Sequence, residues 1–421
     1  MLYHLFEYLD REFDLPGAGL FRYISFRAGL AIMLSLIISL LLGSRIIRSL
    51  KRLQIGETIR DLGLEGQKQK EGTPTMGGLI ILLAILVPCL LLARLDNVYI
   101  IVMLLTTVWM GVIGFIDDYI KIFKKNKQGL KAKFKLFGQI VLGMIIGLVM
   151  LFHNDVVVRL TPEEAANKGY HVIKHVQTQD RSVTGQWKGK DMVYCKSTLT
   201  NVPFLKGNQF DYAYLVSFMG AKAKDWIWLA FIPIMIIIVT GVSNGSNLTD
   251  GLDGLATGVS AIIALALALL AYVSGNTIIA DYLNIFYIPY TEELVVFSAC
   301  FLGACIGFLW YNSYPAKVFM GDTGSLALGA IIAVMAIVLR KELLIPVLCG
   351  IFLVEILSVM IQVYYFKYTK RKYGEGRRIF RMSPLHHHFQ KLGMHEAKIV
   401  TRFWIIGVML AVITLITLKV R

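Results

Sequence analysis

The sequence predicts an all-α integral membrane protein with ten transmembrane helices, and two observations support this prediction. The 421 residues are 56% hydrophobic, with a mean hydropathy of +0.63, which is far too apolar for a soluble protein of this length. The apolar residues are also gathered into runs close to the ~20 residues that a helix needs to cross a bilayer. Because lipid satisfies no backbone polar group, each run is expected to be a helix.

The predicted spans follow one another along a single membrane domain, residues 1–421. They lie at about 23–43, 76–94, 98–120, 135–152, 226–244, 255–274, 292–311, 323–340, 342–366 and 401–420. The first run has the length of a helix and no small-residue cleavage site, so it is expected to remain as the first span rather than to be a signal peptide. Four of the five cysteines fall in spans, and no disulfide is expected.

Lysine and arginine residues predict the orientation. They are abundant in 44–75, 121–134 and 367–400 and absent from the short loops near 95–97 and 275–291. Short loops rich in these residues face the cytoplasm, so both termini are expected to be extracytoplasmic. The net charge of +15 follows this distribution between helices rather than a basic soluble face, and no nucleic-acid partner is expected.

A long loop, 153–225, departs from the apolar pattern. Its runs Asp155–Leu160, Tyr170–Val176 and Asp191–Tyr194 are rich in β-branched and aromatic residues and predict a few short strands, with an unstructured connector as the alternative. The charge rule places this insertion outside the membrane. Replacing it with a short Gly/Ser linker is therefore expected to leave activity in detergent largely intact, at a cost in stability or in assembly with extracytoplasmic partners.

Five polar motifs fall at the predicted cytoplasmic ends of the spans. They are KEGTPTMGG (70–78), Asp117 with Asp118, SNGSNLTDGLDGLATG (243–258), WYNSYPAKVFMGDTGSLALG (310–329) and RRIFRMSPLHHHFQKLG (377–393). Five unrelated loops would not be expected to gather on one side. The motifs therefore indicate one site at the inner membrane surface.

Three aspartates in these motifs predict a metal site. Asp117 and Asp118 end the third span, and Asp322 lies at the start of the eighth. Each alone can be a solvated helix end or an N-cap, but ionisable groups at membrane depth are costly and are usually functional. Three carboxylates at one depth suit Mg²⁺, which prefers a few carboxylates together with phosphate oxygens and water.

The glycine-rich segment 243–258 predicts a polar pocket. If it is helical, Asn247, Asp250 and Asp253 share one face through their spacing of three, and the interleaved glycines allow a ligand to approach closely. A flexible hinge is the alternative. So many amides and carboxylates favour a pocket for a ribose, a base or a sugar.

Basic residues near the aspartates predict attraction of phosphorylated ligands. Lys121, Lys125 and Lys133 are expected to set the topology and also to bind phosphate. Lys70 has a similar choice between snorkelling and ligand contact.

The triple histidine, His386, His387 and His388, does not predict a metal site. Consecutive side chains in a helix point about 100° apart, so three in a row do not converge on one ion. With the neighbouring arginines, this histidine loop is typical of a phosphate or sugar clamp, and a solvated loop is the alternative.

The runs GTPTMGG, GFIDDY, NLTDGLDGLA, FMGDTGSLALG and PLHHHFQ, in this order on ten spans, resemble the phospho-N-acetylmuramoyl-pentapeptide transferases of the polyprenyl-phosphate N-acetylhexosamine-1-phosphate transferase superfamily. The resemblance covers nearly all of the chain apart from 153–225. It implies transfer of phospho-N-acetylmuramoyl-pentapeptide from its UDP derivative to undecaprenyl phosphate, with release of UMP and formation of lipid I. It also implies Mg²⁺ dependence, a homodimer, and a place in the bacterial cytoplasmic membrane with the active site on the cytoplasmic face.

The resemblance further implies roles for single residues. Asp117, Asp118 and Asp322 would be catalytic, with Asp322 and Asp118 as the metal ligands. Substrate contacts are implied for Lys70, Thr75, Asn247, Asp250, Asp253, Asn312, Phe319, Gln362 and the histidines 386–388. Gln390 stands where the family usually has Glu.

Alternatives stay open in mechanism and in function. Asp117 is predicted to accept the proton of the lipid phosphate while Asp118 holds the metal or orients Asp117, and the alternative makes an aspartate the covalent nucleophile. A sister transferase that uses UDP-GlcNAc would differ only in its sugar loops. A cation-coupled transporter would place its acids near the bilayer midplane, whereas these lie at helix ends.

Overall fold

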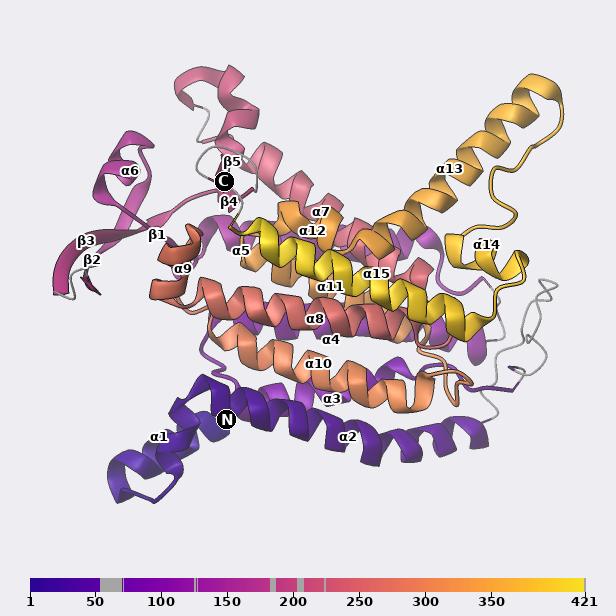
Figure 1. The fold of residues 1–421 in the computed structure, drawn as a ribbon, viewed down its shortest axis with the longest axis horizontal. Helices are drawn as coiled ribbons and strands as arrows, with labels where there is room; N and C mark the ends of the chain where they lie inside the picture. Colours follow the sequence, from indigo (N-terminus) through magenta and orange to yellow (C-terminus); the bar gives the residue numbers. More distant parts are fainter. Residues whose placement is uncertain are drawn as a thin grey trace.

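The computed structural model describes residues 1–53, 70, 72–124, 126, 128–181, 187–202, 208–222 and 225–419. Within these residues, nine helices are long and apolar enough to cross a membrane, and the helix Gly78–Leu92 is an apolar helix of 15 residues. Figure 1 shows them side by side in one bundle, with the two chain termini at the same end. The predicted all-α membrane fold is confirmed.

The ten helices match the predicted spans in order. They are α2 (Ile24–Arg52), α3 (Gly78–Leu92), α4 (Val98–Ile122), α5 (Ala132–Phe152), α7 (Trp228–Thr249), α8 (Leu255–Ser274), α10 (Glu293–Asn312), α11 (Gly321–Val338), α13 (Gly350–Tyr373) and α15 (Glu396–Thr417). Hydropathy identified these helices because each must be apolar along most of its length.

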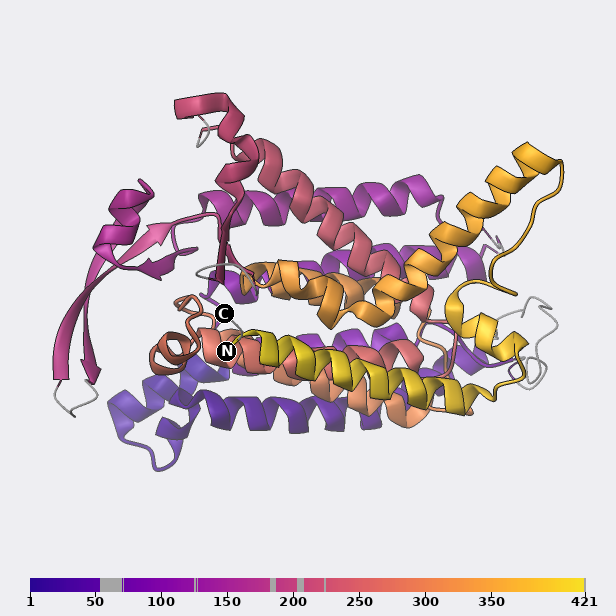
Figure 2. The same cartoon turned by 45° about the horizontal axis from the view of Figure 1, so that its top comes forward.

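The ninth span differs most from its prediction of 342–366. A 3₁₀ turn, η5 (Glu342–Leu344), and a short helix, α12 (Ile345–Leu348), come first, since Pro346 favours the start of a helix over its interior. At its other end α13 continues to Tyr373 through the polar run KYTKRKY. The apolar run ends near residue 366, but the helix continues past it and leaves the bundle at an angle (Figures 1 and 2).

Helix α11 forms the centre of the bundle. Of its most apolar 18-residue window, 89% is buried, against 28% for α2, and it packs on α4, α7 and α8. Such a helix is apolar on all sides because it has no solvent face. Its crossing with α4 is very close: a Cβ at Gly114 would lie 2.2 Å from the carbonyl oxygen of Asp322. This crossing brings the end of α4 to the start of α11.

Several short helices were not predicted, because each is shorter than a membrane span. They are α1 (Leu2–Phe13), η1 (Ala18–Arg22), α6 (Pro162–Asn167), η4 (Tyr212–Lys222), α9 (Thr277–Leu283) and α14 (Leu385–Lys391). Of these, α14 contains the triple histidine.

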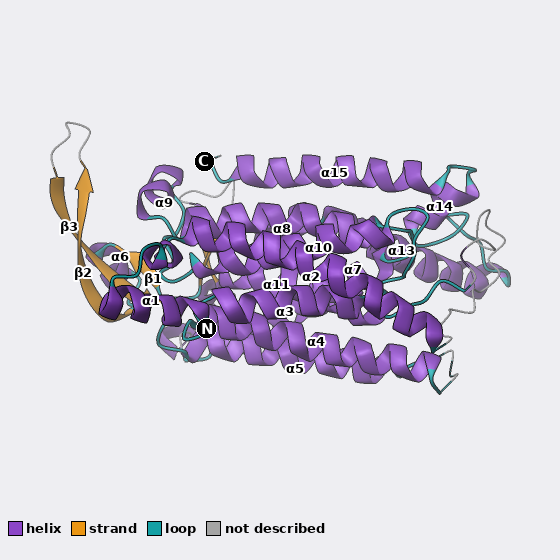
Figure 3. Ribbon diagram, turned by 90° about the horizontal axis from the view of Figure 1, so that it is seen from below, coloured by secondary structure: helices purple, strands orange, loops and turns teal. Residues whose placement is uncertain are grey.

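The insertion contains the predicted strands. β1 (Val158–Leu160), β2 (His171–Arg181) and β3 (Trp187–Lys196) form an antiparallel sheet in the order β1-β3-β2, and β4 (Leu199–Asn201) pairs with β5 (Gln209–Asp211). Figure 3 shows the β2–β3 ribbon projecting from the end of the bundle that holds both termini. The insertion thus lies far from the opposite end of the helices.

The second half of the insertion is joined to the bundle by buried polar contacts. Asn201 donates its backbone N–H to the carbonyl of Arg340 (3.0 Å), and its side-chain oxygen accepts from the ammonium of Lys341. Tyr212 donates to Glu342 (2.8 Å). Lys341 and Glu342 are only 1% and 2% exposed. A linker in place of the insertion would leave both without these partners, so the replacement is expected to lower the stability of the protein.

We expect Asn201→Leu to destabilise the protein by about 2 kcal/mol, because the buried Lys341 amine loses its acceptor. Thermal unfolding in detergent measures this effect, with Asn167→Leu, an exposed change in α6, as the matched control. Equal melting temperatures for the two variants would show that this contact contributes nothing.

Candidate active site

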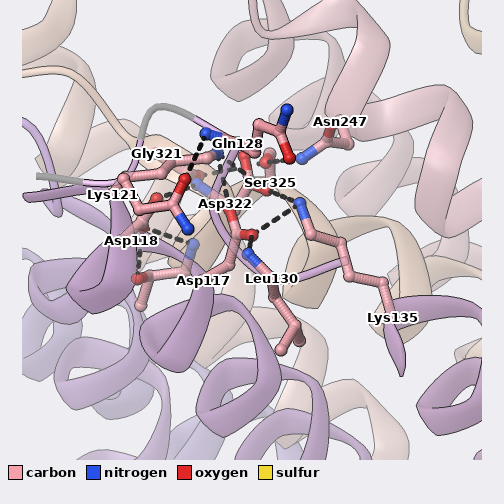
Figure 4. Close-up of polar contacts among 12 residues, drawn as sticks. Asp117, Asp118, Lys121, Gln128, Leu130, Lys135, Asn247, Gly321, Asp322 and Ser325 are labelled. Atoms are coloured by element: carbon pink, nitrogen blue, oxygen red, sulfur yellow. Dashed lines mark hydrogen bonds and ion pairs between the residues drawn. The ribbon is translucent and has the colours of Figure 1, made fainter. Parts of the chain in front are cut away.

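Asp117 and Asp118, near the end of α4, meet Asp322 at the start of α11 (Figure 4). Each of the three offers a carboxylate oxygen within 4.8 Å of the others. Asp117 is fully buried, Asp118 is 3% exposed, and the side chain of Asp322 is 15% exposed. This acidic cluster therefore has a single partly open member, Asp322.

Two lysines join Asp117 to Asp322. The ammonium of Lys121, one turn after Asp117, lies 2.5 Å from Asp117 Oδ2 and 3.2 Å from Asp322 Oδ2. The ammonium of Lys135, in the first turn of α5, lies 2.9 Å from Asp117 Oδ1 and 2.5 Å from the same Asp322 oxygen. Both cations sit between the carboxylates, which offsets the repulsion of like charges this close together.

The α4–α5 loop covers Asp117. The backbone N–H of Leu130 donates to Asp117 Oδ1 at 2.7 Å. Gly129 precedes it with φ +63°, and a Cβ there would lie 2.6 Å from the same oxygen. Only glycine fits both the backbone conformation and the close approach.

Asp118 serves a different purpose from Asp117. Its carboxylate accepts from the backbone N–H groups of Asp322 (3.1 Å) and Thr323 (2.9 Å), and from the Thr323 hydroxyl (2.6 Å). The two backbone N–H groups have no partner within α11, because they lie in its first turn, where a negative charge is favourable. Asp118 thus fixes the place of Asp322. Thr323 was not among the predicted site residues.

The segment 243–258 is not one helix. Asn247, Asp250 and Asp253 therefore do not share a helix face, contrary to the prediction. Helix α7 ends at Thr249, and Gly254 adopts φ +77° at the start of α8. On α7, Asn247 donates to Ser325 of α11 (2.9 Å), and Asp250 ends the helix. Asp253 lies in the turn between the helices.

Asp253 is held by partners from three other segments. It accepts from Lys70 Nζ at 2.7 Å and from the backbone N–H of Ala316 at 3.0 Å. Glu396, in the first turn of α15, accepts from both Lys70 Nζ (2.6 Å) and the backbone N–H of Asp253 (2.7 Å). Glu396 was not predicted as a site residue, because the apolar run of the tenth span was predicted to begin only at 401.

The loops 72–78 and 310–320 pair with each other beside this cluster. Phe319 donates its N–H to Pro74 (2.8 Å) and accepts from Gly77 N–H (2.8 Å), while its ring lies 5.9 Å from the ammonium of Lys70. Asn312 donates to Val318 (2.9 Å) and accepts from Gly254 N–H (3.1 Å), which ties these loops to the α7–α8 turn. Thr75, in the loop 72–78, is buried, with 8% of its surface exposed.

The histidine loop is held by Gln362 of α13. Gln362 Oε1 accepts from Ile379 N–H (3.1 Å) and Phe380 N–H (3.0 Å), and its amide donates to Phe380 O (3.1 Å). His386 is 1% exposed, whereas His387 and His388 are partly exposed. Gln362 and His386 therefore support the loop, and the other two histidines are the ones that a ligand can reach.

The predicted lysines are placed differently from one another. Lys121 contacts Asp117 and Asp322 of the acidic cluster. Lys125 lies outside the described residues. Lys133 is exposed, with its ammonium 5.2 Å from the centre of the Phe134 ring. Two residues later, Lys135 occupies the position that the prediction gave to Lys133.

His387 gives a pH prediction. Burial, helped by the neighbouring His386, lowers the pKa of His387 from 6.5 to about 4, so its ring is neutral at pH 7. Between these two values the unfolded chain binds more protons than the folded chain, so this residue makes stability fall as the pH drops from 6.5 to 4. We expect His387→Gln to flatten the melting temperature across this interval. An unchanged slope would contradict the neutral assignment.

The donor set of the acidic cluster fits a divalent cation. Carboxylate oxygens are the protein ligands that Mg²⁺ prefers, and Asp117 and Asp322 already face the same two ammonium groups. Asp322 is the open member, while the oxygens of Asp118 accept from the start of α11. Of the two predicted metal ligands, Asp322 is thus the better placed.

Comparison with known proteins gives consistent matches. The family model described as glycosyl transferase family 4 matches residues 192–340, and phospho-N-acetylmuramoyl-pentapeptide-transferase signature 1 matches residues 70–82. Proteins named phospho-N-acetylmuramoyl-pentapeptide-transferase are 59% identical in Flavobacterium psychrophilum, 58% in Parabacteroides distasonis and 57% in Flavobacterium johnsoniae, each over 100% of both chains. The chain belongs to the phospho-N-acetylmuramoyl-pentapeptide-transferase family.

Proposed function

We propose that this protein transfers phospho-N-acetylmuramoyl-pentapeptide from its UDP derivative to undecaprenyl phosphate, forming lipid I and releasing UMP. The observation that carries the proposal is the acidic cluster bridged by Lys121 and Lys135, in a chain matched over its whole length by relatives with this name. Transfer of a phosphoryl group needs little covalent help and much charge neutralisation. A cluster of cations and carboxylates is suited to that task.

In the proposed reaction an oxygen of the lipid phosphate attacks the phosphorus that carries the sugar, and the bond from that phosphorus to UMP breaks. Asp322 would hold Mg²⁺, with Asp117 facing the same space. Bound there, Mg²⁺ would neutralise the charge that develops on the leaving UMP. Lys121 and Lys135 then exchange carboxylate contacts for phosphate oxygens, and Asp118 keeps Asp322 in place through the start of α11.

Asp117 is the proposed acceptor of the lipid phosphate proton. It is fully buried, and three donors, Lys121, Lys135 and the Leu130 N–H, fix both of its oxygens. When Lys121 and Lys135 move to phosphate oxygens, as proposed above, the oxygens of Asp117 would become free to accept that proton. The alternative, a covalent phosphosugar intermediate on an aspartate, predicts release of UMP without the lipid acceptor, and a single-turnover measurement distinguishes the two.

The nucleotide is proposed to bind between the α7–α8 turn and the paired loops 72–78 and 310–320. Asn247 lies in the last turn of α7, and Asp250 and Asp253 come from the α7–α8 turn. Lys70 is shared between Asp253 and Glu396. Polar groups from separate segments that converge at one place suit a ribose and a base. The partly exposed His387 and His388 would contact the sugar side.

One assay separates this function from its alternatives. Detergent-solubilised protein is supplied with undecaprenyl phosphate, Mg²⁺ and either UDP-N-acetylmuramoyl-pentapeptide or UDP-GlcNAc, and UMP is measured. We expect UMP from the pentapeptide substrate alone. UMP from UDP-GlcNAc would indicate the sister transferase, and none from either would refute a transferase of this kind.

The active site is proposed to face the cytoplasm, because the lysine-rich loops lie at its end of the bundle. Cys195 is fully buried in β3 and all five cysteines are buried, so single reporter cysteines are needed. We expect an impermeant maleimide to label Ala166→Cys in intact spheroplasts, and Glu375→Cys only after permeabilisation; both replaced residues are exposed. The reverse pattern would invert the topology.

A further inference from the structure

Glu355 is the one acidic residue of the sequence between Leu343 and Phe366, and its side chain is completely buried in α13. It belongs to none of the five polar motifs. An ionisable residue inside an apolar span is costly, and it persists where it has a partner and a task.

The partner of Glu355 is His386, the first of the three histidines. The backbone N–H of His386 donates to Glu355 Oε1 at 3.2 Å, and the ring Nδ1 lies 3.1 Å from Oε2. Both carboxylate oxygens therefore face one residue. The contact joins α13 to the first turn of α14, where the backbone N–H groups have no partner within the helix.

The opposite edge of the His386 ring faces the α7–α8 turn. A Cβ built on Gly251 would lie 2.2 Å from His386 Nε2, so the ring packs directly on the backbone of that turn. Gly251 stands between Asp250 and Asp253. The imidazole thus fills the space between α13 and the turn that carries two proposed nucleotide ligands.

We propose that Glu355 is a positioning residue for the nucleotide sugar. Through His386 it fixes α14 against the α7–α8 turn, so that His387 and His388 are held at a set distance from the nucleotide ligands. Gln362 fixes the beginning of the same loop, at Ile379 and Phe380. Without Glu355, substrate binding must offset the entropy of ordering α14. This inference rests on the proposed function for the identity of the substrate.

The kinetic test compares Glu355→Ala and Glu355→Gln with Glu375→Ala, an exposed change in the loop after α13. We expect Glu355→Ala to raise KM for UDP-N-acetylmuramoyl-pentapeptide at least 10-fold while kcat changes less than threefold. Glu355→Gln keeps an oxygen that accepts from the His386 N–H, so its KM should rise less. An unchanged KM, or a loss confined to kcat, would overturn the positioning role.

The second test needs no substrate. Hydrogen exchange of the amides in 380–392 is measured for the folded wild type, Glu355→Ala, Glu355→Gln and Gly251→Ala. We expect at least 10-fold faster exchange in Glu355→Ala and Gly251→Ala, with Glu355→Gln in between. Wild-type exchange in the alanine variants would overturn the anchor. If the wild type releases no UMP but exchange rises as expected, the proposed function fails while the anchor stands.

Discussion

Replacing Asp322 with Asn is expected to lower UMP release at least about 100-fold while leaving a folded protein in the membrane. Asp322 is the most open carboxylate of the acidic cluster, and it accepts from both Lys121 and Lys135. The amide is nearly isosteric but removes a charge that a divalent cation needs. Because losing a ligand weakens metal binding, raising the Mg²⁺ concentration should recover part of the lost activity.

Thr323→Val is the control variant for Asp322→Asn. That change removes the hydroxyl that donates to Asp118 but keeps the backbone N–H contact, so it should reduce activity far less. Melting temperatures of both variants establish that they are folded. Activity of Asp322→Asn above a tenth of wild type would refute the assignment of Asp322 as a metal ligand.

The sequence was sufficient to predict the ten spans because a membrane requires apolar length, which hydropathy measures directly. Hydropathy does not detect the polar part of a helix that extends beyond its apolar run. The extension of α13 to Tyr373 was therefore not predicted. For the same reason Glu396, at the polar start of α15, was missed. Its contacts with Lys70 and Asp253 link segments 143 or more positions apart, and no local pattern encodes them.

The different contacts of adjacent residues also could not be predicted from their spacing in the sequence. Asp117 and Asp118 are neighbours in the sequence, yet one faces two lysines and the other caps α11. This difference is set by the close crossing of α4 and α11 at Gly114. Sequence motifs identified where charges gather, and the packing of helices decided which of them face each other.

Lys133 and Lys135 show the same limit and lead to the second large prediction. Two residues apart on a helix, they point about 200° from each other, so only one can face the acidic cluster. The start of α5 at Ala132 turns Lys135 inward to Asp117 and Asp322, and Lys133 outward over the Phe134 ring. The structure therefore favours Lys135 over Lys133, the residue predicted from the sequence.

We expect Lys135→Met to lower kcat/KM by about 100-fold, the typical cost of losing one donor that stabilises developing charge. Methionine keeps the apolar stem and removes only the ammonium, so folding should be little affected. Lys124→Met, an exposed change in the neighbouring loop, is the matched control for lost surface charge, and Lys133→Met separates the two candidate lysines. Steady-state UMP release at low and at saturating substrate gives both constants. A larger loss in Lys133→Met than in Lys135→Met would mean that α5 turns its other face to the substrate, and that the bridge from Lys135 to the two carboxylates does not serve the reaction.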